Sequence, residues 1–385
     1  MCSCILRLST IYAVFILTYS HWQQKTMEGN ATKSVQSDNV GEYELSYGND
    51  YYYIANKLDV DKIAIPFTWT LFIIVGLVCN SIVIYVVCRF GTMRTVTNCY
   101  IVNISVSDIV FLLLCAPFTT FNYTRPLWIF GNAMCSVVMY LMQVSVHATS
   151  LTLMAMNIDR YFAIVYPLKS IRYRTATLAL AINISIWIVS GLMSIPIAIF
   201  STVTDFMGRP YCIEQFKDGG FMYYIYVVFT TYIIPLSVLI VCNLNMLRQL
   251  WKSRDQLRDT TLSEHSIKQR RKVTKMILLV VAFFFVCWLP IHVLNFWQRL
   301  GNSINNNLAL AKLRIFALTL AYSNSCVNPF VYAFMGENFR TCFRRAFPMC
   351  SKSNRVAHGS SMNTSRTRET NLQKAAVRIR PDGLC

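Results

Sequence analysis

The stretch MILLVVAFFFVCWLPIHVLNFWQ, residues 276–298, indicates how this chain folds, because its 23 successive residues include no Lys, Arg, Asp or Glu. The hydrocarbon core of a bilayer is about 30 Å thick and is crossed by about 20 mainly apolar residues of α-helix. Charged residues stand directly on both sides, Lys275 before the stretch and Arg299 after it. The stretch therefore predicts a helix that spans a membrane.

Six further runs of the same kind occur along the chain. The seven predicted spans have few or no charged residues in their middles and lie at about 64–88, 98–122, 133–163, 176–200, 222–247, 273–298 and 310–334. The predicted fold is an all-α membrane protein, a seven-transmembrane helix bundle over residues 64–334. An odd number of spans puts the two ends of the chain on opposite sides of the membrane.

The composition agrees with a lipid solvent and excludes a disordered chain. Of the 385 residues, 55% are hydrophobic and 14% charged, whereas a soluble domain has about 45–50% apolar and about 25% charged residues. A net charge of +18 would suit a nucleic-acid binder, but such proteins carry their base on one solvated face. Here the base lies between apolar runs, so we expect lipid and no nucleic acid as partner.

Basic residues in the connecting segments predict the orientation, because cytoplasmic loops are enriched in Lys and Arg. The base-rich segments follow the odd-numbered spans: Arg89 and Arg94; Lys169, Arg172 and Arg174; Arg248, Lys252, Arg254, Arg258, Lys268, Arg270, Arg271, Lys272 and Lys275; and Arg340, Arg344 and Arg345. We therefore expect a multi-pass protein of the plasma membrane with an extracellular N-terminus and a cytoplasmic C-terminus.

The segments outside the bundle have different characters. Residues 1–20 contain a short apolar stretch after Arg7, which fits a cleaved signal peptide as well as a retained segment. Residues 21–63 form an acidic, tyrosine-rich extracellular tail, either a solvated disordered tail or a negative collar that attracts a basic ligand. Residues 348–385 are the cytoplasmic tail, whose serines and threonines suit phosphorylation and arrestin binding or are disordered filler.

Two cysteines and two sequons support this orientation. Cys135 and Cys212 fall at outer loops, where a disulfide persists, and a bridge is favoured over two free thiols. Asn30 and Asn122 begin Asn-X-Thr sequons on the same side and are the predicted glycosylation sites.

Polar residues inside the spans are few, and a charge in lipid is a functional hypothesis by default. Asp108 is predicted to lie at the depth of Asn80, Asn324 and Asn328, and Thr149 belongs to the same predicted cluster. A buried carboxylate must be paired or coordinated. The cluster therefore predicts a water network or a small cation, with sodium as the candidate, and a purely structural hydrogen-bond cluster is the alternative. No other cofactor and no metal centre is expected.

At the inner end of the third span stand Asp159, Arg160 and Tyr161. An acid and a guanidinium there can satisfy each other while the bundle is closed, and the arginine can take another partner when it opens. A surface ion pair is the alternative. Prolines that favour kinks lie in five spans, at Pro117, Pro196, Pro235, Pro290 and Pro329.

Several motifs stand in order along the chain, each in its own span: GLVCN at 76–80, Asp108, DRY at 159–161, Trp187, Pro235, CWLP at 287–290 and NPFVY at 328–332. Together they resemble the rhodopsin-family (class A) G-protein-coupled receptors over roughly residues 64–347. The resemblance implies a receptor that signals to a heterotrimeric G protein. The implied activation switch consists of Asp159, Arg160, Tyr161, Trp288, Pro290, Asn328, Pro329 and Tyr332.

After the seventh span, residues 336–347 carry Phe339, Phe343 and Phe347 at a spacing of four. This pattern predicts an amphipathic helix on the inner leaflet, similar to the eighth helix of that family. Cys342 and Cys350 are the predicted palmitoylation sites.

The segments also resemble particular members of the family. QVSVHAT at 143–149 is similar to kisspeptin receptors, and the sixth span is similar to galanin and allatostatin-A receptors. The implied ligand is an extracellular neuropeptide, kisspeptin-like as first choice, with galanin or allatostatin-A type as alternatives. Met142 stands where receptors for cationic amines carry an aspartate, and Asn243 replaces the family's usual tyrosine in the fifth span.

Polar and aromatic side chains near the outer ends of the spans orient a ligand in an otherwise apolar pocket. The predicted contacts are Gln143, His147, Tyr211, Glu214, His292, Asn295, Gln298 and Tyr322. For His147 the alternative is a hydrogen bond between helices.

Two other classes of protein fit the sequence poorly. A transporter or channel would have repeated halves or a file of charges along a pore, and the seven spans are unlike one another. A metal hydrolase needs clustered His and acids, yet only His147 and His292 fall in spans. We therefore do not expect an enzyme.

Overall fold

The computed structural model describes residues 61–125, 127–206, 208–216, 220–256, 261–300, 308–335 and 337–347. The predicted signal peptide, nearly all of the acidic tail, Asn30, Cys350 and the cytoplasmic tail lie outside the described residues. The chain divides into two compact units, Met1–Phe343 and Arg344–Cys385. All that follows concerns the first unit.

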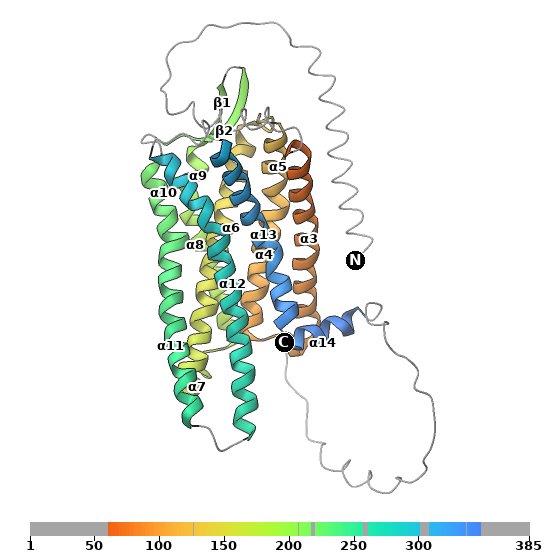
Figure 1. Ribbon diagram of the computed structural model, residues 1–385, viewed down its shortest axis with the longest axis vertical. Helices are drawn as coiled ribbons and strands as arrows, with labels where there is room; N and C mark the ends of the chain where they lie inside the picture. The colour runs from red at the N-terminus through yellow and green to blue at the C-terminus, as the bar shows by residue number, and fades with distance from the viewer. Residues whose placement is uncertain are drawn as a thin grey trace, which may run out of the picture. The chain divides into compact units, whose positions relative to one another are not determined.

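Seven long helical stretches run side by side between two ends of a bundle (Figure 1), which confirms the predicted fold class. They are α3 (Asp61–Arg89), α4 with α5 (Val96–Leu114, Ala116–Thr124), α6 (Gly131–Val165), α8 with α9 (Ala176–Met193, Ile195–Phe200), α10 with η2 and α11 (Phe221–Val228, Phe229–Ile233, Ile234–Gln256), α12 (Thr261–Arg299) and α13 (Leu308–Met335). Three short helices join or follow them: η1 (Gly91–Met93), α7 (Pro167–Ser170) and α14 (Glu337–Ala346).

Six of these stretches are long and apolar enough to cross a membrane, and α13 is not among them. The reason is a run of polar residues in its second half, including Asn324, Ser325 and Asn328, all of which are buried. These side chains turn toward the other helices instead of outward. Helix α13 is therefore less apolar in composition than the other spans, but these polar side chains do not lie on its outward-facing surface.

Proline explains the helix breaks. Cys115 and Ser194 separate α4 from α5 and α8 from α9, and in each case a proline, Pro117 or Pro196, follows two residues later. Pro235 is the second residue of α11 and directly follows the π-helical turn η2. A proline has no N–H to donate to the preceding turn, so the backbone rearranges there. The remaining two of the five predicted kink prolines, Pro290 and Pro329, lie inside the continuous helices α12 and α13, as Pro66 does inside α3.

One element was not predicted: a β-hairpin, β1 (Ser201–Phe206) and β2 (Arg209–Glu214), between α9 and α10. The strands are antiparallel with Val203 opposite Cys212, and the turn contains Gly208 at φ 74°. A left-handed φ suits glycine because it has no Cβ. The all-α prediction missed this hairpin.

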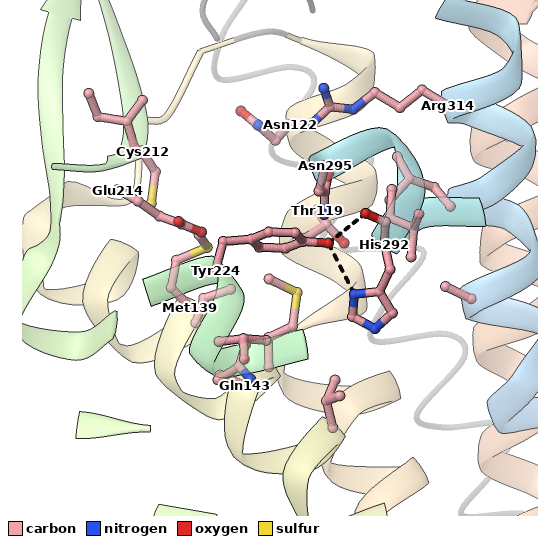
Figure 2. A pocket seen from close by; sticks show the side chains of 18 of the residues that line it. Thr119, Asn122, Met139, Gln143, Cys212, Glu214, Tyr224, His292, Asn295 and Arg314 are labelled. Atoms are coloured by element: carbon pink, nitrogen blue, oxygen red, sulfur yellow. Dashed lines mark hydrogen bonds between the residues drawn. The ribbon is translucent and has the colours of Figure 1, made fainter. Parts of the chain in front are cut away.

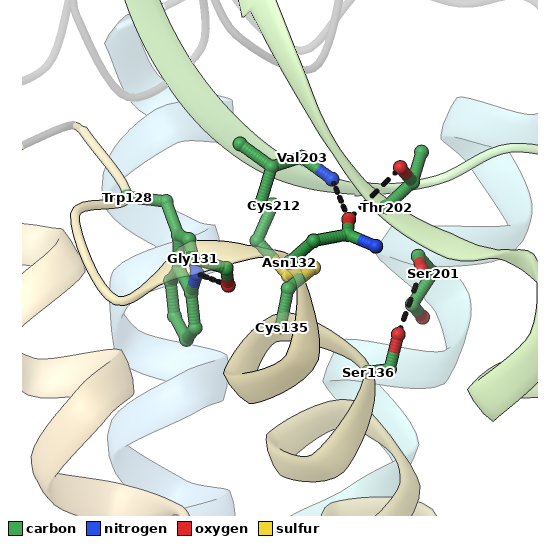
Figure 3. The surroundings of a disulfide bond; sticks show 9 residues. All are labelled: Trp128, Gly131, Asn132, Cys135, Ser136, Ser201, Thr202, Val203 and Cys212. Carbon is green, nitrogen blue, oxygen red and sulfur yellow. Dashed lines mark hydrogen bonds between the residues drawn. A yellow bond between two sulfur atoms is a disulfide. The ribbon is translucent and has the colours of Figure 1, made fainter.

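The hairpin is fastened to the start of α6, as Figure 3 shows. Cys135 and Cys212 form the predicted disulfide, which confirms that prediction. The Oδ1 of Asn132 accepts a hydrogen bond from Val203 N at 2.8 Å, and the Ser136 hydroxyl donates to Ser201 O at 2.9 Å. These contacts fix the hairpin across one end of the bundle, which we call the hairpin end.

Helices α3, α4 and α13 meet closely at Gly76. A Cβ atom added there would lie 2.5 Å from Leu112 Cδ1 and 3.0 Å from Cys326 Sγ. Both neighbours are buried, Leu112 completely, so neither has free space to move into. Glycine at this position lets three helices approach one another.

We predict that Gly76→Ala destabilises the bundle, because an extra methyl group in a filled core costs about 1–3 kcal/mol. The measurement is the thermal unfolding midpoint of the purified protein in detergent. Gly91→Ala is the matched control, because no atom lies within 4 Å of a Cβ added there. Equal midpoints for the two variants would contradict the account of this contact.

Candidate functional site

A cavity of about 270 Å³ lies beneath the hairpin. Figure 2 shows side chains of β2, α5, α6, α10, α12 and α13 around it, and Trp69 of α3 and Phe111 of α4 also line it. Its wall includes seven of the eight predicted ligand contacts: Gln143, Tyr211, Glu214, His292, Asn295, Gln298 and Tyr322. These seven residues come from four distant parts of the sequence, α6, β2, α12 and α13, and we call this cavity the hairpin-end pocket.

The eighth predicted contact, His147, does not line the pocket. It is 0% exposed, and its Nδ1 lies 3.0 Å from the Gln143 carbonyl oxygen while its Nε2 lies 3.1 Å from the Thr230 hydroxyl. The ring joins α6 to the π-helical turn η2. The prediction of a direct ligand contact is not supported, and the alternative, a hydrogen bond between helices, describes this residue.

An aromatic cluster forms the side of the pocket between α10 and α12. The Tyr224 hydroxyl lies 2.8 Å from His292 O and 3.1 Å from His292 Nδ1 (Figure 2). The His292 ring lies 6.1 Å from Trp288, which lies 6.0 Å from Phe284, both between ring centroids. Within the described residues the buried Nε1 of Trp288 has no hydrogen-bond partner. A ligand pressing on this side therefore meets an indole that lies two residues before Pro290 in α12.

The opposite wall contains Trp69, which is not among the predicted ligand contacts. Its ring lies 4.9 Å from Tyr322 and 5.0 Å from Tyr123, and its Nε1 donates to Thr319 Oγ1 at 2.9 Å. The Tyr322 hydroxyl hydrogen-bonds the Thr119 hydroxyl. A tryptophan near the end of a span is typical of a membrane interface, so the sequence carried no signal that this ring turns inward.

Three charged residues line the pocket: Glu214, Arg299 and Arg314. Glu214 Oε2 and Arg299 Nη2 form an ion pair at 2.6 Å. The pKa of the Glu214 carboxyl is raised by burial, and the Arg299 guanidinium partly opposes that shift. Arg314 is 7% exposed and donates to Gln298 Oε1 at 2.8 Å. With one acid against two bases, the wall has a formal charge of +1.

The predicted polar cluster forms in the middle of the bundle. Asn328 Nδ2 donates to Asp108 Oδ2 at 3.0 Å, and Asn80 Nδ2 donates to the Ser325 carbonyl at 2.8 Å. Thr149 is bonded to the Ser107 hydroxyl at 2.9 Å, which makes it a neighbour through α4 and not a direct partner of Asp108.

Two buried amide oxygens, Asn80 Oδ1 and Asn324 Oδ1, have no hydrogen-bond partner within the described residues. Proteins normally satisfy such atoms with water or an ion. Carboxylate and amide oxygens are also the donors that a small hard cation prefers. No group of three or more His, Cys, Asp or Glu side chains in the described ranges is arranged to hold a metal ion.

At the other end of the bundle, Asp159 holds two arginines. Its oxygens accept from Arg174 Nε at 2.8 Å and Arg174 Nη2 at 2.9 Å, and Arg160 Nη2 lies 3.5 Å from Oδ2. The hydrogen bonds that Arg174 donates to Asp159 raise the pKa of the Arg174 guanidinium. The sequence predicts Asp159 and Arg160 as partners but not Arg174, because only the short helix α7 folds this loop residue back onto α6.

The remaining switch residues lie on two helices. Tyr161 packs on Ile164 and Met246, and Tyr332 is buried in α13 with its hydroxyl unpartnered among the described residues. Pro329 precedes Tyr332 by three residues in that helix.

Two predicted modification sites are in tight surroundings. Asn122 lines the hairpin-end pocket with its Oδ1 buried. Cys342 is 5% exposed, and its Sγ lies 3.9 Å from Thr92 Oγ1. Glycosylation at Asn122 and palmitoylation at Cys342 therefore both require the side chain to move, and both stay predictions.

Comparisons with known proteins agree with this architecture. A family model described as "7 transmembrane receptor (rhodopsin family)" matches residues 79–332. The chain is 38% identical to "G-protein coupled receptor 54" of Oreochromis niloticus over 327 residues, 82% of this chain and 86% of the relative. It is 38% identical to the human "KiSS-1 receptor" over 301 residues, 75% of each chain. It is 36% identical to the "Allatostatin-A receptor" of Bombyx mori over 309 residues, 75% of this chain and 84% of the relative.

We predict that Arg299→Gln makes stability depend on pH, because burial then raises the pKa of Glu214 without an opposing charge. A carboxyl whose folded-state pKa is raised adds stability below its unfolded pKa, and this stability is lost as the pH rises through the folded-state pKa. The ordinary pKa of glutamate is about 4.3. The variant should therefore lose more stability than the unmodified protein as the pH rises above that value, between about pH 5 and about pH 7.5.

Thermal unfolding at several pH values measures this effect. Glu214→Gln with Arg299→Gln is the control, because it removes the titrating group and should abolish the extra pH dependence. An Arg299→Gln variant that follows the pH profile of the unmodified protein would contradict the account.

Proposed function

Because the chain belongs to the rhodopsin family of seven-transmembrane receptors, we propose that it is the receptor for an extracellular neuropeptide. This family consists of G-protein-coupled receptors and not of enzymes. The observation that carries the proposal is the hairpin-end pocket. Its mixed wall of aromatic rings and separate polar groups suits a ligand with both apolar and polar side chains.

A kisspeptin-like peptide is the first choice of ligand. Relatives named KiSS-1 receptor reach 38% identity, and an allatostatin-A receptor follows at 36%. An allatostatin-A or galanin type of peptide is the alternative. The formal charge of +1 on the pocket wall supports a neutral or anionic group as the part of the peptide that enters deepest, such as a carbonyl-rich terminus.

The proposed orientation puts the hairpin end outside the cell and the Asp159 end in the cytoplasm. It rests on the base-rich connections, among them Lys169, Arg172 and Arg174, which lie at the Asp159 end. The proposed location is the plasma membrane. An acidic N-terminal tail on the outer side would attract a basic peptide before it enters.

Signalling requires that the peptide bind the open state of the bundle more tightly than the closed state, because equal affinity shifts no population. We infer that the deepest group of the peptide displaces the ring of Trp288, and that α12 then moves at Pro290. Opening of the cytoplasmic end frees Arg160 from Asp159 to contact a heterotrimeric G protein. Arrestin is a further proposed partner of the same end.

The oxygens around Asp108 fit a sodium ion or a cluster of waters. We propose that Asp108, Asn80 and Asn324 hold it, since the two amides have buried oxygens without partners within the described part of the chain. Such a site would stabilise the closed bundle.

A peptide panel tests the proposed ligand. Cells expressing the chain should respond to kisspeptin-type amidated peptides in calcium or cyclic AMP assays, and allatostatin-A and galanin peptides test the alternatives. Arg314→Gln should lower the potency of the active peptide about tenfold or more, since a hydrogen bond to a charged group contributes about 1.5–3 kcal/mol.

Lys312→Gln is the matched control for Arg314→Gln, because Lys312 is exposed on the same helix outside the pocket wall. Silence to the whole panel with normal surface expression would contradict the peptide assignment. Equal potency for the two variants would contradict the placement of the peptide.

The shared carboxylate at the cytoplasmic end yields a second prediction. Arg174 and Arg160 compete for Asp159, so Arg174→Gln should let Asp159 hold Arg160 more closely. We expect lower basal and peptide-stimulated nucleotide exchange on the G protein, whereas Arg172→Gln, an exposed neighbour, should change neither. Arg160→Ala should abolish stimulated exchange. Unchanged or raised exchange in Arg174→Gln would refute the competition.

A further inference from the structure

A second cavity, of about 830 Å³, lies on the side surface of the helix bundle, away from the hairpin-end pocket. Its wall comes from α4, α6 and α8, with the short helix α7 and the segment that follows it at one end. We call it the α6–α8 groove. Most of its length is apolar, with Leu151 and Ile158 on α6 and Ile182, Ile186 and Val189 on α8.

The groove changes character at its α7 end. Lys169, Tyr173 and Arg174 line it there, and both Lys169 and Tyr173 are exposed. The one acid in the wall is Asp159, which is already held by Arg174 in the ion pair described above. The mouth of the groove therefore has an excess of positive charge beside a mainly apolar wall.

The geometry of the ion pair leaves part of Arg174 for another partner. Asp159 uses Nε and Nη2 of the guanidinium, so Nη1 lies outside the pair. Two cationic side chains, one of them oriented by a carboxylate, thus flank the same mouth. Charge-assisted hydrogen bonds from arginine and lysine are the usual contacts of a phosphate group.

We propose that the α6–α8 groove binds an anionic phospholipid of the cytoplasmic leaflet. An acyl chain lies along the apolar wall between α6 and α8, and the phosphate binds Lys169 and Arg174 Nη1. Both walls belong to membrane-spanning helices, which excludes a soluble partner from most of the groove. The cationic mouth favours a lipid with net negative charge, since such lipids are enriched in that leaflet and attract basic residues near the surface.

The bound lipid also touches the switch. Arg160 and Arg174 share the carboxylate of Asp159. A lipid phosphate bound to Arg174 therefore holds the arginine that competes with Arg160 for this carboxylate. The inference rests on the proposed function only for the choice of leaflet. Lipid retention is measured without peptide or G protein, so it succeeds or fails independently of the receptor assay.

The test uses the full-length protein in nanodiscs containing equal amounts of phosphatidylcholine and phosphatidylserine, followed by native mass spectrometry of the lipid that stays bound. Phosphatidylserine should be retained in preference to phosphatidylcholine. Lys169→Gln should weaken retention about fivefold, which corresponds to about 1 kcal/mol for one basic residue at an anionic surface. Ser185→Phe should reduce it further, because Ser185 lines the groove and a phenyl ring fills it.

Matched controls separate the groove from general effects. Arg172→Gln removes an exposed neighbouring charge outside the groove, and Ile184→Phe adds a ring to an outward-facing position of α8 that does not line it. Both should retain phosphatidylserine like the unmodified protein, and equal unfolding midpoints show that all variants are folded. Equal retention of both lipids would mean surrounding bilayer lipid only and would overturn the proposal. So would Lys169→Gln and Ser185→Phe variants that behave like their controls.

Discussion

A bilayer offers no hydrogen bonds to a protein within it, and this constraint shapes the rest of the structure. It requires helices, since only they satisfy the backbone locally, and it turns the polar side chains of each span inward. Asp108 with Asn328 is one result, and Asn103, which accepts from Trp187 Nε1 at 2.9 Å and donates to Thr152 at 2.7 Å, is another. The few polar groups inside the bundle therefore lie at the contacts between helices, where a change of packing must rearrange them.

The same constraint separates two sites at opposite ends of the bundle. At one end a disulfide fixes the hairpin over a pocket where Glu214 pairs with Arg299 and Arg314 adds a second positive charge. At the other end one carboxylate, Asp159, serves two guanidiniums. One carboxylate shared by two guanidiniums has more than one stable arrangement. This site can therefore act as a two-state element whose equilibrium responds to binding at either end of the bundle.

The parts predicted from sequence are those set directly by lipid or by the outside milieu. Uncharged runs mark the spans because charges are costly in hydrocarbon, and the prolines just after the helix breaks act through a missing N–H. The disulfide followed from two cysteines at outer loops. Seven of the eight predicted ligand contacts line the hairpin-end pocket, because polar groups in the outer halves of spans have few other places to point. Those residues remain candidates for ligand contact.

The parts that were missed depend on tertiary geometry. The direction of His147 is set by the rotation of α6 about its axis, which hydropathy did not resolve. Arg174 looked like one more loop base, and Arg314 like one more charge at a span end, because nothing local tells a solvated guanidinium from a buried one. The hairpin was missed because its two six-residue strands lie in a region read only as a loop.

The central claim, that peptide binding at the hairpin-end pocket is coupled to Arg160 at the other end, is tested most directly through its reciprocal. Coupling between two sites is mutual, so a G protein bound at the Arg160 end must change the affinity for peptide. The measurement is the peptide dissociation constant of the purified receptor with and without nucleotide-free heterotrimer. Tighter peptide binding with the heterotrimer, lost in Arg160→Ala, is the predicted result. The same dissociation constant in both conditions would contradict the account.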